Sequence, residues 1–279
     1  MSRPLEGKLA IITGSSRGIG AAIAENLASK GCNLIINYTS SSSTAAAASL
    51  CAHLSTTHSI TAHPVQADLG TPSGPSLLVT TTTQSLFPNS KIDVIINNAG
   101  IAQNAPISTF TPAQFDATYR VNVLGPLLLM QAAAPHLPHD RSGRVINISS
   151  VSSSTGFVGQ SVYGGSKAAL EAMTRTWARE LAERATVNAV NPGPVEGPMY
   201  ASNTPEFLEG IKGWIMHTPG MAPREGVDSP EVVKEARESG GRLAKASEVA
   251  GIVAMLCTPD AQWCTGQVVC ANGGMLMMH

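Results

Sequence analysis

The sequence has little charge, few aromatic residues and no cluster of basic residues. Of its 279 residues, 13% are charged and 4% are aromatic, and the formal net charge is −1. Because nucleic acids and anionic membranes attract proteins through basic patches, this composition argues against both as partners. The chain is nevertheless 43% hydrophobic and long enough to bury a sizeable core.

The sequence also lacks an apolar run at its start and any metal-type spacing of cysteine or histidine. Residues 1–8 contain no apolar stretch, so we expect no signal peptide, no membrane span and a cytoplasmic location. An odd number of scattered cysteines is typical of buried thiols in a reducing compartment. The five are Cys32, Cys51, Cys257, Cys264 and Cys270. The seven histidines are equally scattered, and we expect no metal site.

What the sequence does contain is a regular alternation of short apolar runs and helix-like segments. Strands are predicted at residues 9–12, 32–37, 60–65, 92–96, 145–148, 186–190 and 267–270. Helices are predicted at residues 21–30, 45–54, 115–134, 163–184 and 246–257. Such alternation predicts a parallel sheet covered on both faces. We expect an α/β protein in which residues 1–279 form a single doubly wound (Rossmann) domain around a seven-stranded parallel sheet.

Two segments depart from this alternation. Residues 70–90 begin with a turn-like stretch, and residues 77–86 have the length of a helix but contain the β-branched run 80–83. Residues 194–241 are rich in glycine, proline and methionine, and a long insertion of this kind is often a substrate loop or lid. Its apolar residues suit a packed core and a substrate pocket equally well.

Tyr163 and Lys167 are one turn apart on the helix predicted at 163–184, so they lie on one face. An adjacent ammonium group favours a phenolate, and we expect it to lower the pKa of Tyr163. Such a phenol exchanges a proton with a carbonyl or an alcohol near neutral pH. The pair alone is more often a helix surface, but Ser150 ends an apolar run thirteen residues earlier and supports a functional site.

Gly14, Gly18 and Gly20 lie between the first predicted strand and the first predicted helix. Glycines here let the backbone approach a pyrophosphate, and the helix N-terminus offers free N–H groups and positive potential. A tight loop without a ligand is the alternative for this segment alone.

Taken together, the motifs resemble those of the short-chain dehydrogenase/reductase family. In chain order they are residues 13–20 (Thr-Gly-Ser-Ser-Arg-Gly-Ile-Gly), Asp68, residues 97–100 (Asn-Asn-Ala-Gly), Asn122, Ser150, Tyr163, Lys167 and residues 191–193 (Asn-Pro-Gly). The resemblance covers about residues 7–274. It implies an oxidoreductase that transfers a hydride between a nicotinamide cofactor and a carbonyl or alcohol carbon.

The resemblance implies catalytic roles for four side chains. Tyr163 is the expected general acid in reduction and base in oxidation, and Lys167 is expected to lower its pKa and bind the nicotinamide ribose. Ser150 is expected to hold the substrate oxygen. Asn122 is expected to bend its helix and hold a water molecule that links Lys167 to solvent.

The resemblance also implies which residues contact the cofactor. Asp68 is expected to accept a hydrogen bond from the adenine amino group, although it also suits a helix N-cap. Asn97 is expected to stabilise the sheet end, and Gly197 replaces a threonine that is usual in the family. The expected contacts are Gly14, Ser16, Arg17, Gly18, Ile19, Gly20, Tyr38, Thr39, Ser40, Asp68, Asn98, Ala99, Gly100, Tyr163, Lys167, Pro192, Gly193 and Val195.

The end of the second predicted strand favours NADP(H) over NAD(H). An acidic residue there would bind the adenosine ribose and repel a 2′-phosphate, but residues 37–41 contain no carboxylate. Arg17 and the hydroxyls of residues 39–41 are instead expected to bind that phosphate, unless they form only a solvated loop.

These expectations define an NADPH-dependent reductase that converts a ketone to a secondary alcohol. Aromatic and methionine residues in 194–241 favour a bulky or aromatic substrate, similar to those of polyketide and hydroxynaphthalene reductases of secondary metabolism. The alternatives are a redox-neutral dehydration, epimerisation or cyclisation with the same cofactor, and a non-catalytic NADP sensor or scaffold. Similar proteins are homodimers or homotetramers that use helices matching 115–134 and 163–184, and the apolar tail 271–278 also favours an interface between copies.

Overall fold

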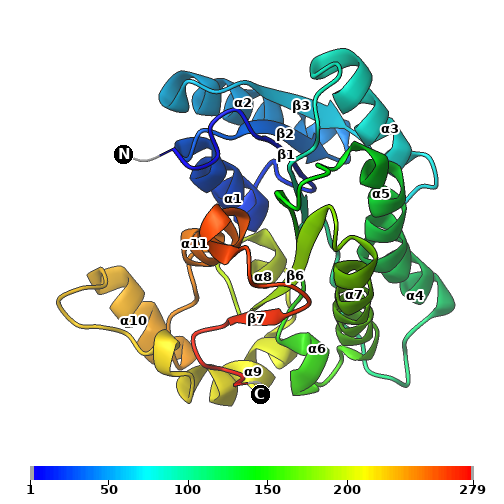
Figure 1. Ribbon diagram of the computed structural model, residues 1–279. Helices are drawn as coiled ribbons and strands as arrows, with labels where there is room; N and C mark the ends of the chain where they lie inside the picture. Colours follow the sequence, from blue (N-terminus) through cyan, green and yellow to red (C-terminus); the bar gives the residue numbers. More distant parts are fainter. Residues whose placement is uncertain (1–2, 278–279) are drawn as a thin grey trace.

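A seven-stranded, entirely parallel sheet forms the centre of the molecule in the computed structural model, which describes residues 3–277 (Figure 1). Its strands are β1 (Leu9–Ile12), β2 (Asn33–Tyr38), β3 (Ala62–Gln66), β4 (Val94–Asn97), β5 (Gly143–Ile148), β6 (Ala185–Pro192) and β7 (Val268–Ala271). They follow the order β3-β2-β1-β4-β5-β6-β7. The order reverses between β1 and β4, and such reversal points form ligand-binding crevices at the carboxyl ends of the strands. The predicted doubly wound α/β fold is confirmed.

Helices cover both faces of this sheet. One face carries α1 (Gly18–Ser29), α2 (Thr44–His58) and α11 (Ala246–Cys257). The other face carries α3 (Gly74–Thr80), α5 (Gly125–Ala133) and α7 (Ser161–Glu180). Further helices are α4 (Pro112–Tyr119), α6 (Ser152–Thr155), α8 (Pro198–Ala201), α9 (Pro205–Met216) and α10 (Pro230–Ser239).

Strand β1 is apolar and buried on both faces, which explains its continuous hydrophobic run in the sequence. In β1, Ala10 and Ile12 belong to a buried cluster with side chains of α1 and α11. Leu9 and Ile11 belong to the cluster on the other face, with side chains of α5 and α7. Because successive side chains of a strand point to opposite faces, one apolar run supplies both halves of the core.

The ambiguous segment 70–90 is helical. It forms α3 and then the π-helical segment η2 (Thr81–Leu86). The hydroxyls of Thr82 and Thr83 donate to the carbonyls of Leu78 and Val79, four residues earlier, at 2.8 and 3.0 Å. These bonds satisfy the threonines inside a helix that their β-branched side chains disfavour by themselves.

The helix predicted at 115–134 begins earlier than expected and is interrupted. Thr111 and Gln114 form a capping box that starts α4 at Pro112. The π-helical segment η3 (Arg120–Leu124) then separates α4 from α5. Other boundaries shift by a few residues, as in α2, which extends to residue 58, and α7, which ends at residue 180.

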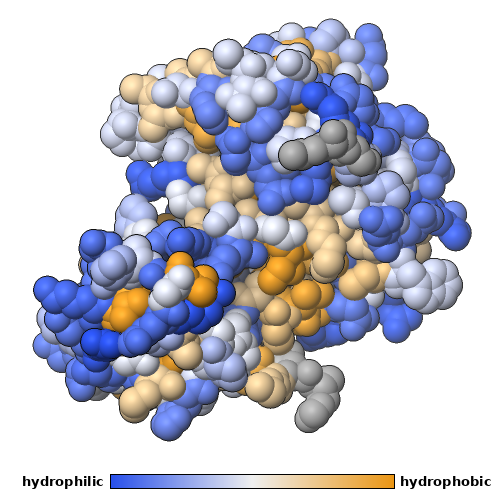
Figure 2. All heavy atoms as spheres, turned by 90° about the vertical axis from the view of Figure 1, so that its left-hand side faces the viewer, coloured by the Kyte–Doolittle hydropathy of each residue, from blue (hydrophilic) through white to orange (hydrophobic). Residues whose placement is uncertain are grey.

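Residues 194–241 contain α8, α9 and α10 and project from the body of the molecule (Figure 1). Ile211, Ile215 and Met221 are buried and form a separate small core. Trp214 is 43% exposed and Met216 is also exposed, so the apolar residues of this segment divide between core and surface. Figure 2 shows mostly hydrophilic residues over the part that carries α10.

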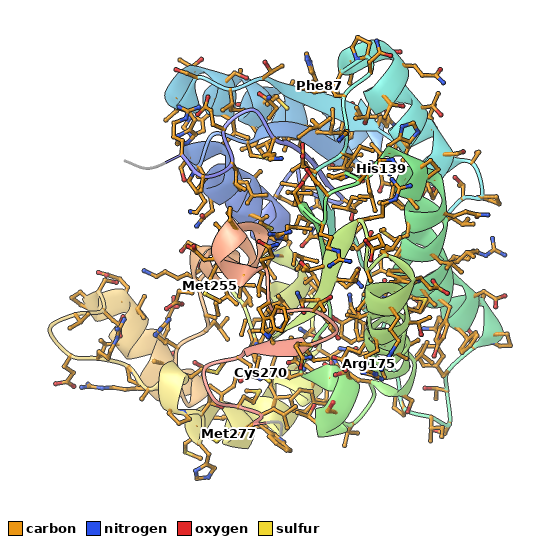
Figure 3. The ribbon with its side chains drawn as sticks, in the orientation of Figure 1. Phe87, His139, Arg175, Met255, Cys270 and Met277 are labelled. Carbon is orange, nitrogen blue, oxygen red and sulfur yellow. The ribbon has the colours of Figure 1, made fainter. Side chains whose placement is uncertain are left out.

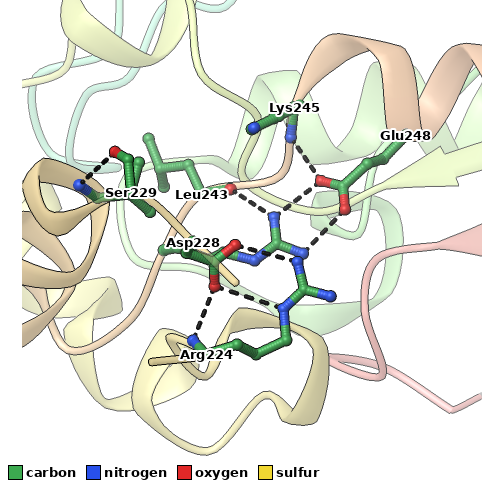
Figure 4. Close-up of polar contacts among 8 residues, drawn as sticks. Arg224, Asp228, Ser229, Leu243, Lys245 and Glu248 are labelled. Carbon is green, nitrogen blue, oxygen red and sulfur yellow. Dashed lines mark hydrogen bonds and ion pairs between the residues drawn. The ribbon is translucent and has the colours of Figure 1, made fainter. Parts of the chain in front are cut away.

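Charged side chains fasten the base of this segment to α11 (Figure 4). Arg242 donates two hydrogen bonds of 2.8 Å to the carboxylate of Glu248, which also accepts from the backbone N–H of Lys245 at 2.8 Å. Arg224 and Asp228 form a second ion pair of 3.0 Å. Bidentate arginine–carboxylate pairs fix geometry better than single contacts, so the segment has a defined attachment.

The cysteines and the C-terminal tail differ in part from expectation. Cys264 and Cys270 are only half-buried, whereas the other three cysteines are buried, and all five are free (Figure 3 labels Cys270). In the tail, Met275 is buried and Met277 is exposed, while Met278 lies outside the described residues. Within residues 3–277, no helix has the length and apolar character needed to cross a bilayer.

Candidate active site

Three of the four predicted catalytic side chains meet at the carboxyl end of β5. Ser150 follows this strand, and Tyr163 and Lys167 lie in the first two turns of α7. All three are buried. The Lys167 Nζ is 5.8 Å from the centre of the Tyr163 ring. The thirteen-residue spacing therefore brings the hydroxyl, the phenol and the amine together.

The expected lowering of the Tyr163 pKa is wrong for this structure. Burial of the phenol raises its pKa, and the interaction with the Ser150 side chain opposes this rise only in part. The Lys167 ammonium group donates to the carbonyl of Ile148 at 2.7 Å. Removal of the phenol from water therefore outweighs the hydrogen bond with Ser150 in setting the pKa of Tyr163.

Lys167 is a deeply buried cation. Its side chain is 4% exposed, and burial lowers its pKa to about 8, while the carboxylate of Glu171 acts in the opposite direction. A Cβ atom at Gly100 would lie 3.3 Å from the Lys167 Nζ. The turn that follows β4 therefore lies close to the lysine, and a larger residue at position 100 would press on its amine.

Asn122, the fourth predicted catalytic residue, lies in η3, so its helix is distorted as expected. Its amide oxygen accepts from the N–H of Ile101 at 2.9 Å, and its amide nitrogen donates to the Ile101 carbonyl at 2.9 Å. The same nitrogen donates to the Ser166 hydroxyl at 3.0 Å. Asn122 thus connects α7 to the loop after β4.

The glycine turn after β1 fits tightly against the turn after β4. Gly14 has a φ of +60°, and a Cβ atom there would lie 2.9 Å from the Ala99 Cα. A Cβ atom at Gly20 would lie 2.6 Å from the Asn98 Nδ2. That nitrogen donates to the carbonyls of Thr13 and Gly14 at 2.8 and 3.0 Å. Glycine is therefore required at both positions for steric reasons.

Hydrogen-bond donors gather beside this turn. α1 begins at Gly18 without a side-chain cap, which leaves N–H groups of its first turn available. Arg17 is exposed and, within the part of the chain that the structure describes, forms no ion pair. The N–H of Ser15 donates to the Asn37 carbonyl at 2.9 Å, which places the end of β2 alongside. These donors fit the pyrophosphate of a dinucleotide.

The last residue of β2 is buried, whereas the residues that follow this strand are exposed. Tyr38, the last residue of β2, is buried and belongs to the core cluster that includes side chains of α1 and α2. Thr39 and Ser40 are exposed, the Ser40 hydroxyl is hydrogen-bonded to the Ser42 hydroxyl at 2.7 Å, and residues 39–41 contain no carboxylate. Of the other predicted contacts, Ser16 is half-buried and Ile19 packs partly on the core.

Asp68 does not cap a helix. Its Oδ1 accepts a hydrogen bond from the N–H of Gly70 at 2.9 Å. Helix α3 begins only at Gly74, and its N-cap residue, Ser73, makes no side-chain capping hydrogen bond. The second carboxylate oxygen makes no hydrogen bond within residues 3–277, and the residue is exposed. Asn97, by contrast, is buried and donates to the Asn147 Oδ1 at 2.8 Å, which confirms its predicted role at the sheet end.

Pro192 ends β6 and Gly193 begins the loop that follows, where a Cβ atom would lie 3.3 Å from Asn272. Val195 then pairs with Ala244 as an isolated bridge. Gly197 has a φ of +143°, a conformation that side-chain-bearing residues rarely adopt. The glycine that replaces the family's usual threonine is therefore demanded by the local backbone.

Side-chain amides from three loops form a chain near Tyr163. The Gln160 Nε2 donates to the Asn104 Oδ1 at 3.2 Å, and the Asn104 Nδ2 donates to the Asn203 Oδ1 at 2.7 Å. The amide oxygens of Gln103 and Gln160 are buried and have no hydrogen-bond partner within residues 3–277. Gln160 is the N-cap residue of α7 and lies three residues before Tyr163 in the sequence.

Aromatic side chains join the loop before α7 to helix α9. The Phe157 ring meets Trp214 edge-to-face at a centroid distance of 5.5 Å and Phe207 at 6.4 Å. The loop before α7 and helix α9 are therefore held together by these rings.

Sequence reasoning did not identify these amides, nor Glu171 next to Lys167. A spacing signal existed for two of them, because Gln160 precedes Tyr163 by three residues and Glu171 follows Lys167 by four. The partners Asn104 and Asn203 come from distant loops and carry no such signal.

A doubly wound sheet with a glycine turn after β1 and a buried serine, tyrosine and lysine after β5 has the architecture of a nucleotide-dependent dehydrogenase. Residues 8–207 match the family model described as short chain dehydrogenase. The chain belongs to this family of oxidoreductases.

Three similar proteins cover nearly the whole chain. An L-xylulose reductase from Aspergillus niger is 55% identical over 99% of both chains. An L-xylo-3-hexulose reductase from Hypocrea jecorina is 48% identical over 99% of both chains. A solved structure of a blue fluorescent protein from a metagenomic library, in complex with NADPH, is 32% identical with a TM-score of 0.82, covering 98% of this chain and 100% of that one.

Proposed function

We propose that the protein is an NADPH-dependent reductase that converts the ketone of an open-chain ketose to a secondary alcohol. The names of its relatives from Aspergillus niger and Hypocrea jecorina support this substrate class. The solved structure with NADPH supports the cofactor, together with Arg17 and the absence of a carboxylate in residues 37–41.

The site residues have separate tasks in this reaction. When bound, the nicotinamide supplies a hydride to the carbonyl carbon. Tyr163 gives its proton to the carbonyl oxygen, and Ser150 donates a hydrogen bond to that oxygen as negative charge develops on it. Lys167 stabilises the phenolate that remains, and Asn122 holds a water molecule through which the tyrosine regains a proton.

The observation that carries the choice of a ketose is the pair of buried amide oxygens of Gln103 and Gln160, which have no hydrogen-bond partner within residues 3–277. A polyhydroxylated substrate presents several hydroxyl groups that both donate and accept hydrogen bonds. Buried amide oxygens without partners are unfavourable unless a ligand satisfies them. An aliphatic ketone without hydroxyls would leave these oxygens unsatisfied.

A second candidate substrate is an aromatic or polyketide-like ketone. It is favoured by the Phe157, Phe207 and Trp214 rings, because aromatic faces and edges bind flat apolar groups. The same rings also serve to hold α9 in place, whereas the unsatisfied amide oxygens have no structural use. We therefore place the ketose first.

The substrate class is tested by following NADPH oxidation with L-xylulose, 2-pentanone and a bicyclic aromatic ketone, with product analysis. We expect one alcohol formed per NADPH and the highest kcat/KM for L-xylulose. Gln160→Leu should lower kcat/KM for L-xylulose about tenfold or more, since one to two kcal/mol of hydrogen bonding is lost. It should leave 2-pentanone almost unchanged. The exposed Gln262→Leu serves as the control.

Three outcomes would redirect this proposal. Preference for the aromatic ketone would support the second candidate. Product formation without net NADPH oxidation would indicate a redox-neutral reaction. NADPH binding without any turnover would favour a sensor or scaffold.

Several further assignments belong to the same proposal. We propose that residues 1–279 act as one domain in which 194–241 serve as the substrate loop, and that the protein is cytoplasmic. Homodimers or homotetramers would form through α4, α5 and α7. Light scattering at micromolar concentration tests the last point, and a monomer would contradict it.

A further inference from the structure

A buried carboxylate lies next to the proposed catalytic residues and has no part in the reaction described above. Glu171 follows Lys167 by one turn of α7, and its side chain is only 6% exposed. Within residues 3–277 it forms no ion pair with an arginine or histidine. Burying a carboxylate costs several kcal/mol unless hydrogen bonds and a compensating charge offset the loss of water.

Two serine hydroxyls supply the hydrogen bonds. The Oε1 of Glu171 accepts from the Ser149 hydroxyl at 2.6 Å and from the Ser153 hydroxyl at 2.7 Å. These serines stand on either side of Ser150, one before it and one in α6. The carboxylate therefore fastens both sides of the short loop that presents Ser150 to the substrate.

The cation on which the charge of Glu171 acts is Lys167, one turn earlier on α7, although the two form no ion pair within residues 3–277. The groups around this lysine are few. On α7 they are Tyr163 and Glu171, β5 contributes the neutral Ile148 carbonyl, and Gly100 in the turn after β4 carries no charge. Glu171 is thus the one anionic group that acts on Lys167 in the part of the chain described by the structure. In a site that excludes water, a single charge has a large effect.

We infer that Glu171 is a positioning residue of this active site, which fixes the Ser150 loop and supplies the negative charge that keeps Lys167 protonated. The inference rests on the proposed function, because it assigns Glu171 to the same site. Its charge opposes the burial that brings the pKa of Lys167 to about 8. Without that charge, Lys167 would lose its proton at a lower pH and could no longer stabilise the Tyr163 phenolate.

The test is the pH dependence of kcat/KM for NADPH-dependent reduction of L-xylulose. Glu171→Gln retains an amide oxygen that accepts from the serines and removes only the charge. We expect the alkaline decline of its profile to move to lower pH by about one unit, the lower end of the effect of a nearby opposite charge. Glu171→Asp, which retains the charge, should restore a profile close to that of the unchanged protein.

Two control variants separate charge from structure. Ser153→Ala removes one hydrogen bond to Glu171 but leaves the charge, and its profile should not move along the pH axis. Glu180→Gln removes an exposed carboxylate from the same helix, and it should also have no effect. A Glu171→Gln profile that coincides with the unchanged protein would refute the inference.

A second measurement does not depend on activity. NMR of protein labelled at lysine Cε follows the titration of Lys167 directly, with Lys167→Met used to assign its signal. The titration midpoint should fall in Glu171→Gln and stay near its original value in Glu171→Asp. If the unchanged protein does not reduce L-xylulose at any pH, the proposed function is wrong, but this titration still decides the role of Glu171. If the titration midpoint of Lys167 were the same in Glu171→Gln as in the unchanged protein, the proposed role of Glu171 would be overturned.

Discussion

Replacing Gly20 with alanine is expected to destabilise the protein, although alanine normally stabilises helices. The new Cβ atom would lie 2.6 Å from the Asn98 Nδ2 and 2.7 Å from the Gly14 carbonyl oxygen. Overpacking of this kind costs about 1–3 kcal/mol. Moving Asn98 would also weaken its two hydrogen bonds to Thr13 and Gly14, each contributing about 1 kcal/mol.

Alanine offsets about 1 kcal/mol of this loss through its better helix propensity. The free energy of unfolding should therefore fall by about 2–4 kcal/mol, which corresponds to a decrease in Tm of roughly 3–7 °C for a chain of this size. Chemical denaturation and calorimetry measure the two quantities. NADPH affinity should fall as well, because the turn that receives the pyrophosphate is displaced.

The matched control is Gly251→Ala in α11. A Cβ atom there has no neighbour within 4 Å, so only the gain in helix propensity remains. We expect this variant to be more stable by up to about 1 kcal/mol. If Gly20→Ala were as stable as Gly251→Ala, the close packing of the glycine turn against Asn98 would be refuted.

Three further predictions concern the cofactor and the proton. The kcat/KM of the unchanged protein should decline as the pH rises through about 8, because Lys167 loses its proton there; a profile still flat at pH 9.5 would contradict this. Arg17→Gln should weaken NADPH binding about tenfold or more and leave NADH binding unchanged, as measured by fluorescence titration. Gly197→Thr should lower the free energy of unfolding by about 1–3 kcal/mol without tightening cofactor binding, since its φ of +143° strains a β-branched residue. Tighter binding would mean that the missing hydroxyl matters.

Much of the fold can be predicted from local patterns in the sequence. The strands are short apolar runs because both faces of the sheet are covered, and Gly14 and Tyr163 lie where a turn and a helix were expected. Segment 70–90 resisted prediction because the hydrogen bonds of Thr82 and Thr83 to earlier carbonyls reverse their usual preference. The start of α4 follows a capping box of Thr111 and Gln114 whose spacing is present in the sequence but was not used in the prediction.

The parts of the site that could not be predicted depend on burial and on contacts between distant loops. The sign of the Tyr163 pKa shift follows from how little water reaches the phenol, which spacing does not reveal. The amide chain requires Asn104 and Asn203 to meet across 99 residues. Glu171 has a helical spacing signal, but its importance comes from two serines on another segment.

The most direct test of the central claim compares the unchanged protein with Tyr163→Phe. NADPH oxidation with L-xylulose should fall by about 10²–10⁴ in kcat when the phenol proton is removed, while the Kd for NADPH stays within twofold. Turnover within a few-fold of the unchanged protein would contradict the assignment of Tyr163 as the proton donor, and with it the account of this site.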